Sequence, residues 1–131
     1  MAEKHITPEI AEELVRIQAF LEEEPRDDVP EILIERLTKL NALMARTGFL
    51  WAEAKADQDA AIAAVFAENS KAILQMPATV SQKFIAALCK DENYYVSLTE
   101  RINRTCVHQS DNLRTQVSYA KENMALTRKG Y

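Results

Sequence analysis

One segment of the sequence constrains the fold more than any other, because it runs from Pro30 to Pro77 without a strong helix stop. Within this segment, residues suited to a helix–helix seam recur at alternating spacings of four and three. The seam positions are Leu33, Leu37, Leu40, Met44, Thr47, Trp51, Ala54, Gln58, Ala61, Val65, Glu68, Ala72 and Gln75. This spacing predicts one very long, coiled-coil-like helix over residues 30–76.

A helix of this length determines the shape of the molecule. At 1.5 Å per residue it extends for roughly 65–70 Å, whereas a compact chain of 131 residues is roughly 30–35 Å across. Such a helix cannot be buried in a monomeric globule. We therefore expect an elongated helical bundle that self-associates as a homo-oligomer.

Two features of the long segment leave its details open. Gly48 costs about 1 kcal/mol in a helix interior, so the helix either continues through this residue or bends or breaks there. The stretch from Ala52 to Ala67 is rich in alanine. Alanine allows a partner helix to approach closely, but it also has a high helix propensity of its own. Both interpretations of the alanines stand.

A shorter helix precedes the long one. Thr7 is a preferred N-cap residue and Pro8 suits the first helical position. Pro25 disfavours a helical residue before it, so we expect the first helix over residues 8–24. The apolar residues Ile10, Leu14, Ile17 and Leu21 give it one buried side. We expect Asp28 to cap the long helix, with Pro30 in its first turn.

Two more helices are expected after Pro77. Thr79 and Gln82 have the spacing of a capping box, which predicts a short amphipathic helix over residues 80–90. A final helix is expected over residues 92–127. One side of it carries Tyr95, Leu98, Ile102, Cys106, Gln109, Leu113, Val117, Ala120 and Met124. The whole chain, 1–131, is therefore expected to form one all-α domain.

Composition argues against a membrane protein and against a disulfide scaffold. Charged residues make up 27% of the chain, and no window has the run of about 18 apolar residues that a membrane span needs. The first five residues lack the basic and apolar regions of a signal peptide. Cys89 and Cys106 form no CxxC pair. We expect reduced thiols in a cytoplasmic protein.

Charge is distributed unevenly along the chain. Residues 1–60 contain 7 basic and 14 acidic residues, whereas residues 101–131 contain 6 basic and 2 acidic residues. The two ends could neutralise each other, within one chain or between subunits, or the basic end could bind an acidic partner. Neutralisation between the ends is the favoured interpretation.

The segment from Asn103 to Ser118 is unusual for a helix surface, because short hydrogen-bonding residues replace the usual Glu, Lys and Ala. Placed on a helix, one polar stripe is formed by Arg101, Arg104, His108, Asp111, Thr115 and Ser118, and Gln109 and Gln116 fall at the seam. One hypothesis is a buried polar network that determines the register of a helix assembly; the other is a recognition surface centred on His108. The candidate residues are Arg101, Arg104, His108, Gln109, Asp111, Arg114, Thr115 and Ser118.

No catalytic, cofactor or metal site is expected. Cys106 and His108 are two residues apart, so on a helix they point away from each other, and Ser110 fails the same geometric test against His108. His5 and His108 offer no metal-ligand spacing, and no Glu-x-x-His motif is present. With only two glycines, the chain has no Gly-rich phosphate loop.

Nucleic acid is the alternative partner. The basic residues of the final helix could contact phosphates, with tyrosines as aromatic companions. These basic residues are Arg101, Arg104, Arg114, Lys121, Arg128 and Lys129. They are spread around the helix rather than clustered, which favours a protein partner.

The last third of the chain resembles the C-terminal segment of small helical proteins encoded by bacteriophages and prophages. The matching pattern begins with Arg101-x-Asn103, continues as His-Gln-x-Asp-x-Leu-Arg-Thr over residues 108–115, and ends with Ser118 and the pair Lys121-Glu122. The resemblance implies an accessory phage protein in the host cytoplasm, acting on replication, recombination or a host defence. It implies no mechanism.

These observations together predict a non-enzymatic accessory protein that self-assembles and binds a macromolecular partner, with action against a host defence as one role. The alternative is a recombination or replication accessory protein that binds nucleic acid through its basic C-terminal helix.

Overall fold

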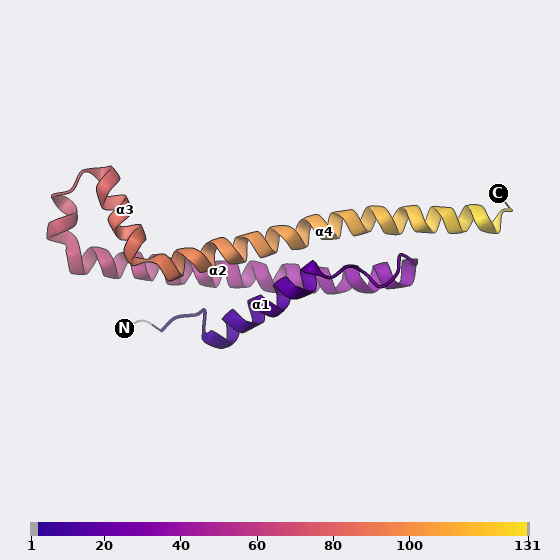
Figure 1. Ribbon diagram of the computed structural model, residues 1–131, viewed down its shortest axis with the longest axis horizontal. Coiled ribbons are helices and arrows are strands. Elements are labelled where there is room, and N and C mark those ends of the chain that lie inside the picture. Colours follow the sequence, from indigo (N-terminus) through magenta and orange to yellow (C-terminus); the bar gives the residue numbers. More distant parts are fainter. Residues whose placement is uncertain (1–2, 131) are drawn as a thin grey trace.

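The computed structural model describes residues 3–130, and within this range it contains four α-helices and no strand. The helices are α1 (Pro8–Glu22), α2 (Pro30–Leu74), α3 (Ala78–Leu88) and α4 (Lys90–Arg128). Helices α2 and α4 run antiparallel along the length of the molecule, α1 lies against them, and α3 turns the chain around at one end (Figure 1). The predicted all-α, elongated fold is confirmed.

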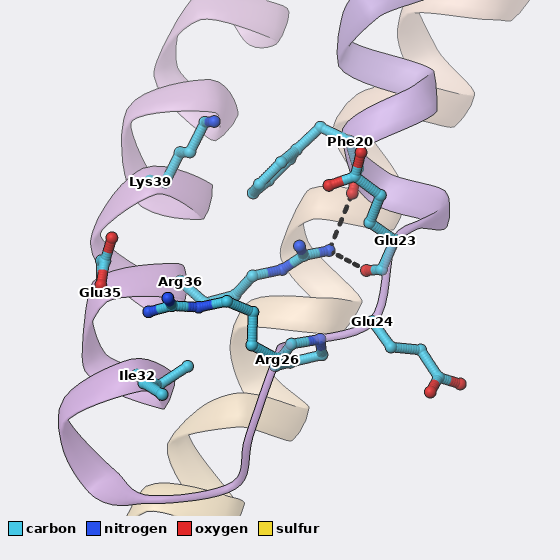
Figure 2. A pocket seen from close by; sticks show the side chains of 9 residues that line it. Phe20, Glu23, Glu24, Arg26, Ile32, Glu35, Arg36 and Lys39 are labelled. Atoms are coloured by element: carbon cyan, nitrogen blue, oxygen red, sulfur yellow. Dashed lines mark hydrogen bonds between the residues drawn. The ribbon is translucent and has the colours of Figure 1, made fainter.

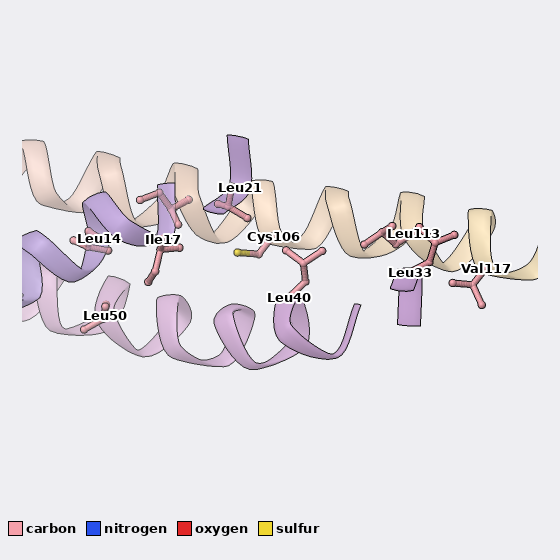
Figure 3. Close-up of a cluster of buried hydrophobic side chains, with 10 residues drawn as sticks. Leu14, Ile17, Leu21, Leu33, Leu40, Leu50, Cys106, Leu113 and Val117 are labelled. Carbon is pink, nitrogen blue, oxygen red and sulfur yellow. The ribbon is translucent and has the colours of Figure 1, made fainter. Parts of the chain in front are cut away.

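The long helix packs against α4 of the same chain. Leu33, Leu40 and Leu50 of α2 are buried with Cys106 and Leu113 of α4 in one apolar cluster (Figure 3). Three residues of α1 close this cluster from the side: Leu14, Ile17 and Leu21. The apolar seam of α2 is therefore covered within the monomer, so the length of α2 does not by itself require a second chain.

The predicted seam is buried along only part of α2. Its positions are buried or half-buried as far as Val65, whereas Glu68, Ala72 and Gln75 are exposed. The reason is that α4 begins beside the middle of α2, where Gln58 Nε2 donates to Asn93 Oδ1 at 2.7 Å. Beyond this point α2 has no long helix alongside it.

Helix α2 is continuous through Gly48, and its backbone departs from helical geometry at Asn69 instead (φ −125°, ψ 20°). The Asn69 side chain donates to the carbonyl of Val65 at 2.9 Å, a local bond that competes with the helical backbone pattern. Asparagine thus disrupts the helix where glycine does not. The possibility of a break at Gly48 is excluded.

The helix starts confirm one predicted cap and correct two. Thr7 caps α1 by accepting from the Ile10 amide at 3.2 Å. Asp28 does not cap α2, because Pro30 holds the preceding residue, Val29, in the extended conformation, and Val29 becomes the N-cap. Thr79 does not cap α3 either, and the expected capping box is absent. Pro77 is the N-cap, and its carbonyl accepts from the amide of Ser81 at 3.0 Å.

The C-terminal end of α1 carries three glutamates in sequence, which oppose the helix dipole, and α2 supplies a compensating cation. Arg36 Nη2 donates to the carbonyl of Phe20 at 2.9 Å and also to the carbonyl of Glu23 (Figure 2). The guanidinium lies 4.0 Å from the centre of the Phe20 ring, and Lys39 Nζ lies 4.2 Å from it. The open cavity of about 270 Å³ at this junction is therefore part of the α1–α2 contact.

A second contact fixes α1 along α2. The Arg46 guanidinium forms a bidentate pair with Glu13, with distances of 2.7 Å and 2.8 Å.

None of the helices between residues 3 and 130 combines the length and the apolar character that a membrane span requires.

Candidate partner-binding site

Several large apolar side chains are exposed at the end of the molecule at which the chain reverses. We call residues 62–93 the hook; it comprises the last part of α2, all of α3 and the first turn of α4 (Figure 1). Helix α3 contains no buried residue. Several large apolar side chains of the hook are exposed, namely Ile62, Phe66, Leu74, Val80 and Leu88. This concentration of exposed apolar surface makes the hook the first candidate for binding.

The local sequence explains why the hook is apolar but poorly packed. Ile62, Val65, Phe66 and Ile73 follow helical spacing and form one stripe on α2. Only Ile73 of this stripe is buried, because α3 lies at an angle to α2 and covers the stripe incompletely (Figure 1).

An open cavity of about 240 Å³ lies between α2 and the chain that returns along α3. Its lining is mainly apolar and consists of Ile62, Gln82, Ile85, Ala86, Cys89 and Asn93. A cavity of this size and composition can accept one apolar side chain, and the amides of Gln82 and Asn93 at its edge can form hydrogen bonds.

Charge contributes little to the hook. It contains three basic and three acidic residues, so its net charge is zero, whereas the whole chain has a net charge of −4. Cys89 is buried, and burial together with the nearby Glu92 carboxylate raises the pKa of its thiol. The hook therefore offers apolar contact rather than a reactive nucleophile.

The polar stripe predicted on the last helix lies on the solvent side of α4. Seven of the eight candidate residues, including all six of the stripe, are exposed: Arg101, Arg104, His108, Asp111, Arg114, Thr115 and Ser118. Arg104 pairs with Glu100 at 2.6 Å and Arg114 with Asp111 at 3.1 Å, both within α4. The stripe is therefore not buried within one chain. The hypothesis of a buried polar network is wrong for the monomer.

Gln109, which was predicted at the seam, is the one candidate residue that links two helices. Its Nε2 donates to the carbonyl of Leu21 at 2.8 Å, near the end of α1. It therefore helps to determine the register of α1 on α4, as a polar seam residue was expected to do. Whether the other seven bind a partner stays a prediction.

The polar cluster around Asp57 was not predicted from the sequence. This carboxylate is buried and accepts from the amides of His5 and Ile6 at 2.8 Å and 2.9 Å. The His5 ring contacts the same carboxylate at 2.9 Å and reaches Glu53 at 3.8 Å. The only available signal was an acidic residue three positions after the buried seam residue Ala54, in a stretch otherwise rich in alanine.

The chemistry of the Asp57 cluster is structural. Burial alone would raise the pKa of Asp57, but the hydrogen bonds from the two amides and the imidazole outweigh it, so the pKa lies below its usual value. The carboxylate thereby attaches residues 3–6 to α2. Across residues 3–130, no group of His, Cys, Asp or Glu side chains could hold a metal ion.

No protein-family model, no curated protein and no solved structure matches this chain. The resemblance of the last third to phage proteins therefore stays a prediction, and the functional argument depends on the geometry of the molecule.

Proposed function

We propose that this chain is a non-enzymatic, phage-type accessory protein of the host cytoplasm that self-associates and binds a macromolecular partner. The partner surface is the hook, and the partner is a protein that contributes an amphipathic helix. The observation that carries this proposal is the exposure of Ile62, Phe66 and Leu88 on the hook, where Ile62 also lines an open apolar cavity.

An amphipathic helix suits the hook because it would continue an interface that the fold already contains. Helix α4 covers the α2 seam only as far as Gln58, and the next seam positions, Ala61 and Val65, are half-buried. A second helix lying on α2 and α3 would extend the same packing, with its apolar residues as anchors in the groove. The zero net charge of the hook favours apolar anchors over an ionic partner.

The rest of the fold supports such a role. Helices α2 and α4 form a long, well-packed rod, and the hook lies at one end of it (Figure 1). A rod of this kind presents a binding site at a distance from its own bulk. Binding a host defence protein and blocking its surface is one function that this arrangement would serve.

The proposal is tested with a fluorescent, electrically neutral peptide that forms a leucine-rich amphipathic helix. We expect the full-length protein to bind this peptide, and Phe66→Ser to weaken the affinity at least tenfold. Phe49→Ser is the matched control, because Phe49 is 54% exposed against 45% for Phe66 and lies outside the hook. Circular dichroism verifies that both variants fold. Absence of peptide binding, or equal binding by the two variants, would refute the proposal.

Site-specific photo-crosslinking in cells provides the second measurement. A photoreactive residue at position 66 should yield one cross-linked protein, and the same residue at position 49 should not. If the product at position 66 is only a second copy of this chain, the hook is a self-association site and the protein-partner proposal fails.

Nucleic acid remains the alternative because of one observation. Lys121, Arg128 and Lys129 of α4 are exposed, and none of them forms an ion pair with any residue between 3 and 130. Labelled single- and double-stranded DNA would be titrated at low and at moderate salt. An electrostatic contact must weaken as salt rises, so absence of salt-dependent binding removes this alternative.

A further inference from the structure

Two exposed segments of opposite charge lie at the end of the molecule away from the hook. The acidic turn, residues 22–35, contains seven carboxylates and one arginine, so its net charge is −6. All seven carboxylate residues are exposed. The basic tail, residues 119–130, comprises the last turns of α4 and the two residues after it. It contains three basic residues, Lys121, Arg128 and Lys129, and one acidic residue, Glu122, so its net charge is +2.

The two segments do not neutralise each other within the chain. The ion pairs of residues 3–130 join Lys4 to Glu92, His5 to Glu53 and Asp57, and three arginines to nearby glutamate or aspartate residues outside both segments. Glu31, Lys121 and Arg128 line the same open crevice of about 290 Å³, yet none of them is paired. Opposite charges thus lie near one another and remain available.

The apolar seam of α4 also continues past the helix that covers it. Val117 is 8% exposed, whereas Met124, two seam positions later, is 41% exposed. The cause is that α2 begins at Pro30 while α4 runs on beyond it (Figure 1). Ile34 near the start of α2 lines the same crevice as Met124 and is also exposed.

We infer that this end of the molecule is the surface through which two copies of the chain pair. In a twofold arrangement, the basic tail of each copy lies on the acidic turn of the other, and Met124 of each copy covers Ile34 of the second copy. Each tail, with a net charge of +2, then lies on a turn with a net charge of −6, and the exposed apolar side chains cover each other in one self-complementary patch, as a twofold interface requires. The inference rests on the self-association in the proposed function and not on the hook.

A second copy fits this surface better than nucleic acid does. A polyanion that approached the tail would also meet the net charge of −6 on the acidic turn, which repels it. A second copy presents both signs of charge in the required places. The helical part of the tail, from Tyr119 to Arg128, is about 15 Å long, which is enough to reach over the first turns of another α2.

The test is the molar mass of the full-length protein by sedimentation equilibrium. We expect a dimer of the 14.8 kDa chain at tens of micromolar protein, with a dissociation constant that rises at least tenfold between low salt and 1 M NaCl. Reversing the tail with Lys121→Glu, Arg128→Glu and Lys129→Glu should give a monomer. Reversing the turn with Glu22→Lys, Glu24→Lys and Glu35→Lys should do the same.

A mixture of the two reversed variants provides the decisive result. Each contact between unlike variants is again attractive, so an equimolar mixture should restore the dimer mass. The control is Lys71→Glu, Lys83→Glu and Lys90→Glu, which makes the same charge change on exposed residues of the hook and should leave the dimer intact.

Three outcomes would overturn the inference: a wild-type monomer at low salt, a mixture that stays monomeric, or a dimer lost only in the hook control. Tight, salt-dependent DNA binding by a wild-type monomer would assign the tail to nucleic acid. The peptide measurement at the hook separates the two proposals, because a monomer that still binds the peptide overturns only the dimer, and a dimer that does not bind it overturns only the hook.

Discussion

Individual polar residues hold the two long helices in register. Asn103 of α4 donates through Nδ2 to the carbonyl of Met44 at 2.9 Å and to Thr47 Oγ1 at 3.1 Å. The same amide nitrogen is 3.5 Å from the position that a Cβ at Gly48 would occupy. The glycine thus lies at the point where an α4 side chain reaches the backbone of α2, and the helix does not bend there.

Asn103→Ala should lower the free energy of unfolding by about 1–2 kcal/mol, because the Thr47 hydroxyl and the Met44 carbonyl each lose a partner in a partly buried place. Urea denaturation at pH 7 measures the change. Asn112→Ala on the exposed side of the same helix is the control and should change the free energy by less than about 0.5 kcal/mol. Equal effects of the two substitutions would contradict a bridging role for Asn103.

Asp57 provides a second prediction at the residue scale. Asp57→Ala leaves the partly buried amide of His5 and the buried amide of Ile6 without this partner, so it should destabilise the protein by about 1–3 kcal/mol at pH 7, whereas Asp59→Ala in the same helix should have little effect. The pKa of Asp57 is lowered below 3.8 by folding. Its contribution to stability is therefore fully present above that value and is lost as the pH falls through the folded pKa.

The pH dependence is measured by thermal unfolding of wild type and Asp57→Ala between pH 7 and pH 2. The difference in stability between them should stay constant down to about pH 4 and shrink below it. A difference that instead shrinks between pH 7 and pH 5 would contradict a lowered pKa of Asp57.

At the scale of the elements, α2 has two parts with different surroundings. From Leu33 to Ala54 its seam is buried against α4, and from Ile62 onward its apolar stripe is mostly exposed. The deviation at Asn69 separates the straight rod from the last turns, which lead into α3. The hook is thus a less stable appendage of a well-packed rod.

Amide hydrogen exchange should detect this division. Amides of α3 and of residues 66–74 should exchange through local opening, faster than those of residues 33–54, because few buried contacts are lost when the hook opens. The measurement is mass-spectrometric exchange of the full-length chain. Protection of α3 as strong as that of residues 33–54 would show that the hook is packed more tightly than its exposed side chains indicate.

At the scale of the whole molecule, the two ends differ in chemistry. The hook is apolar and has no net charge, whereas the other end carries the acidic turn and the basic tail. A rod with unlike ends can assemble through one and bind through the other. This separation is why the two proposals can be tested by independent substitutions.

Small-angle scattering tests the overall shape. The 45 residues of α2 extend for roughly 65 Å, so the maximum dimension of the monomer should be well above the roughly 35 Å of a compact chain of this length. The tail-reversed variant is used at high salt, to keep the sample monomeric. A maximum dimension near that of a globule would contradict the extended arrangement of α2 and α4.

The sequence by itself determined the local features. Prolines at positions 8, 25, 30 and 77 and the 4-3 spacing of apolar residues located all four helices to within two residues at each end. These signals depend on backbone sterics and side-chain period, which neighbouring residues set. The same period showed that one side of the long helix must be buried.

Only the tertiary structure decided which surface covers the apolar side of α2. A periodic seam specifies an apolar face but carries no information on which surface covers that face, so α4 of the same chain and a second chain were equally compatible with the spacing. The contacts of Asp57 with His5 and of Arg36 with Phe20 likewise join residues 52 and 16 positions apart. Such contacts depend on how the helices pack, and that packing also leaves one end apolar and the other charged.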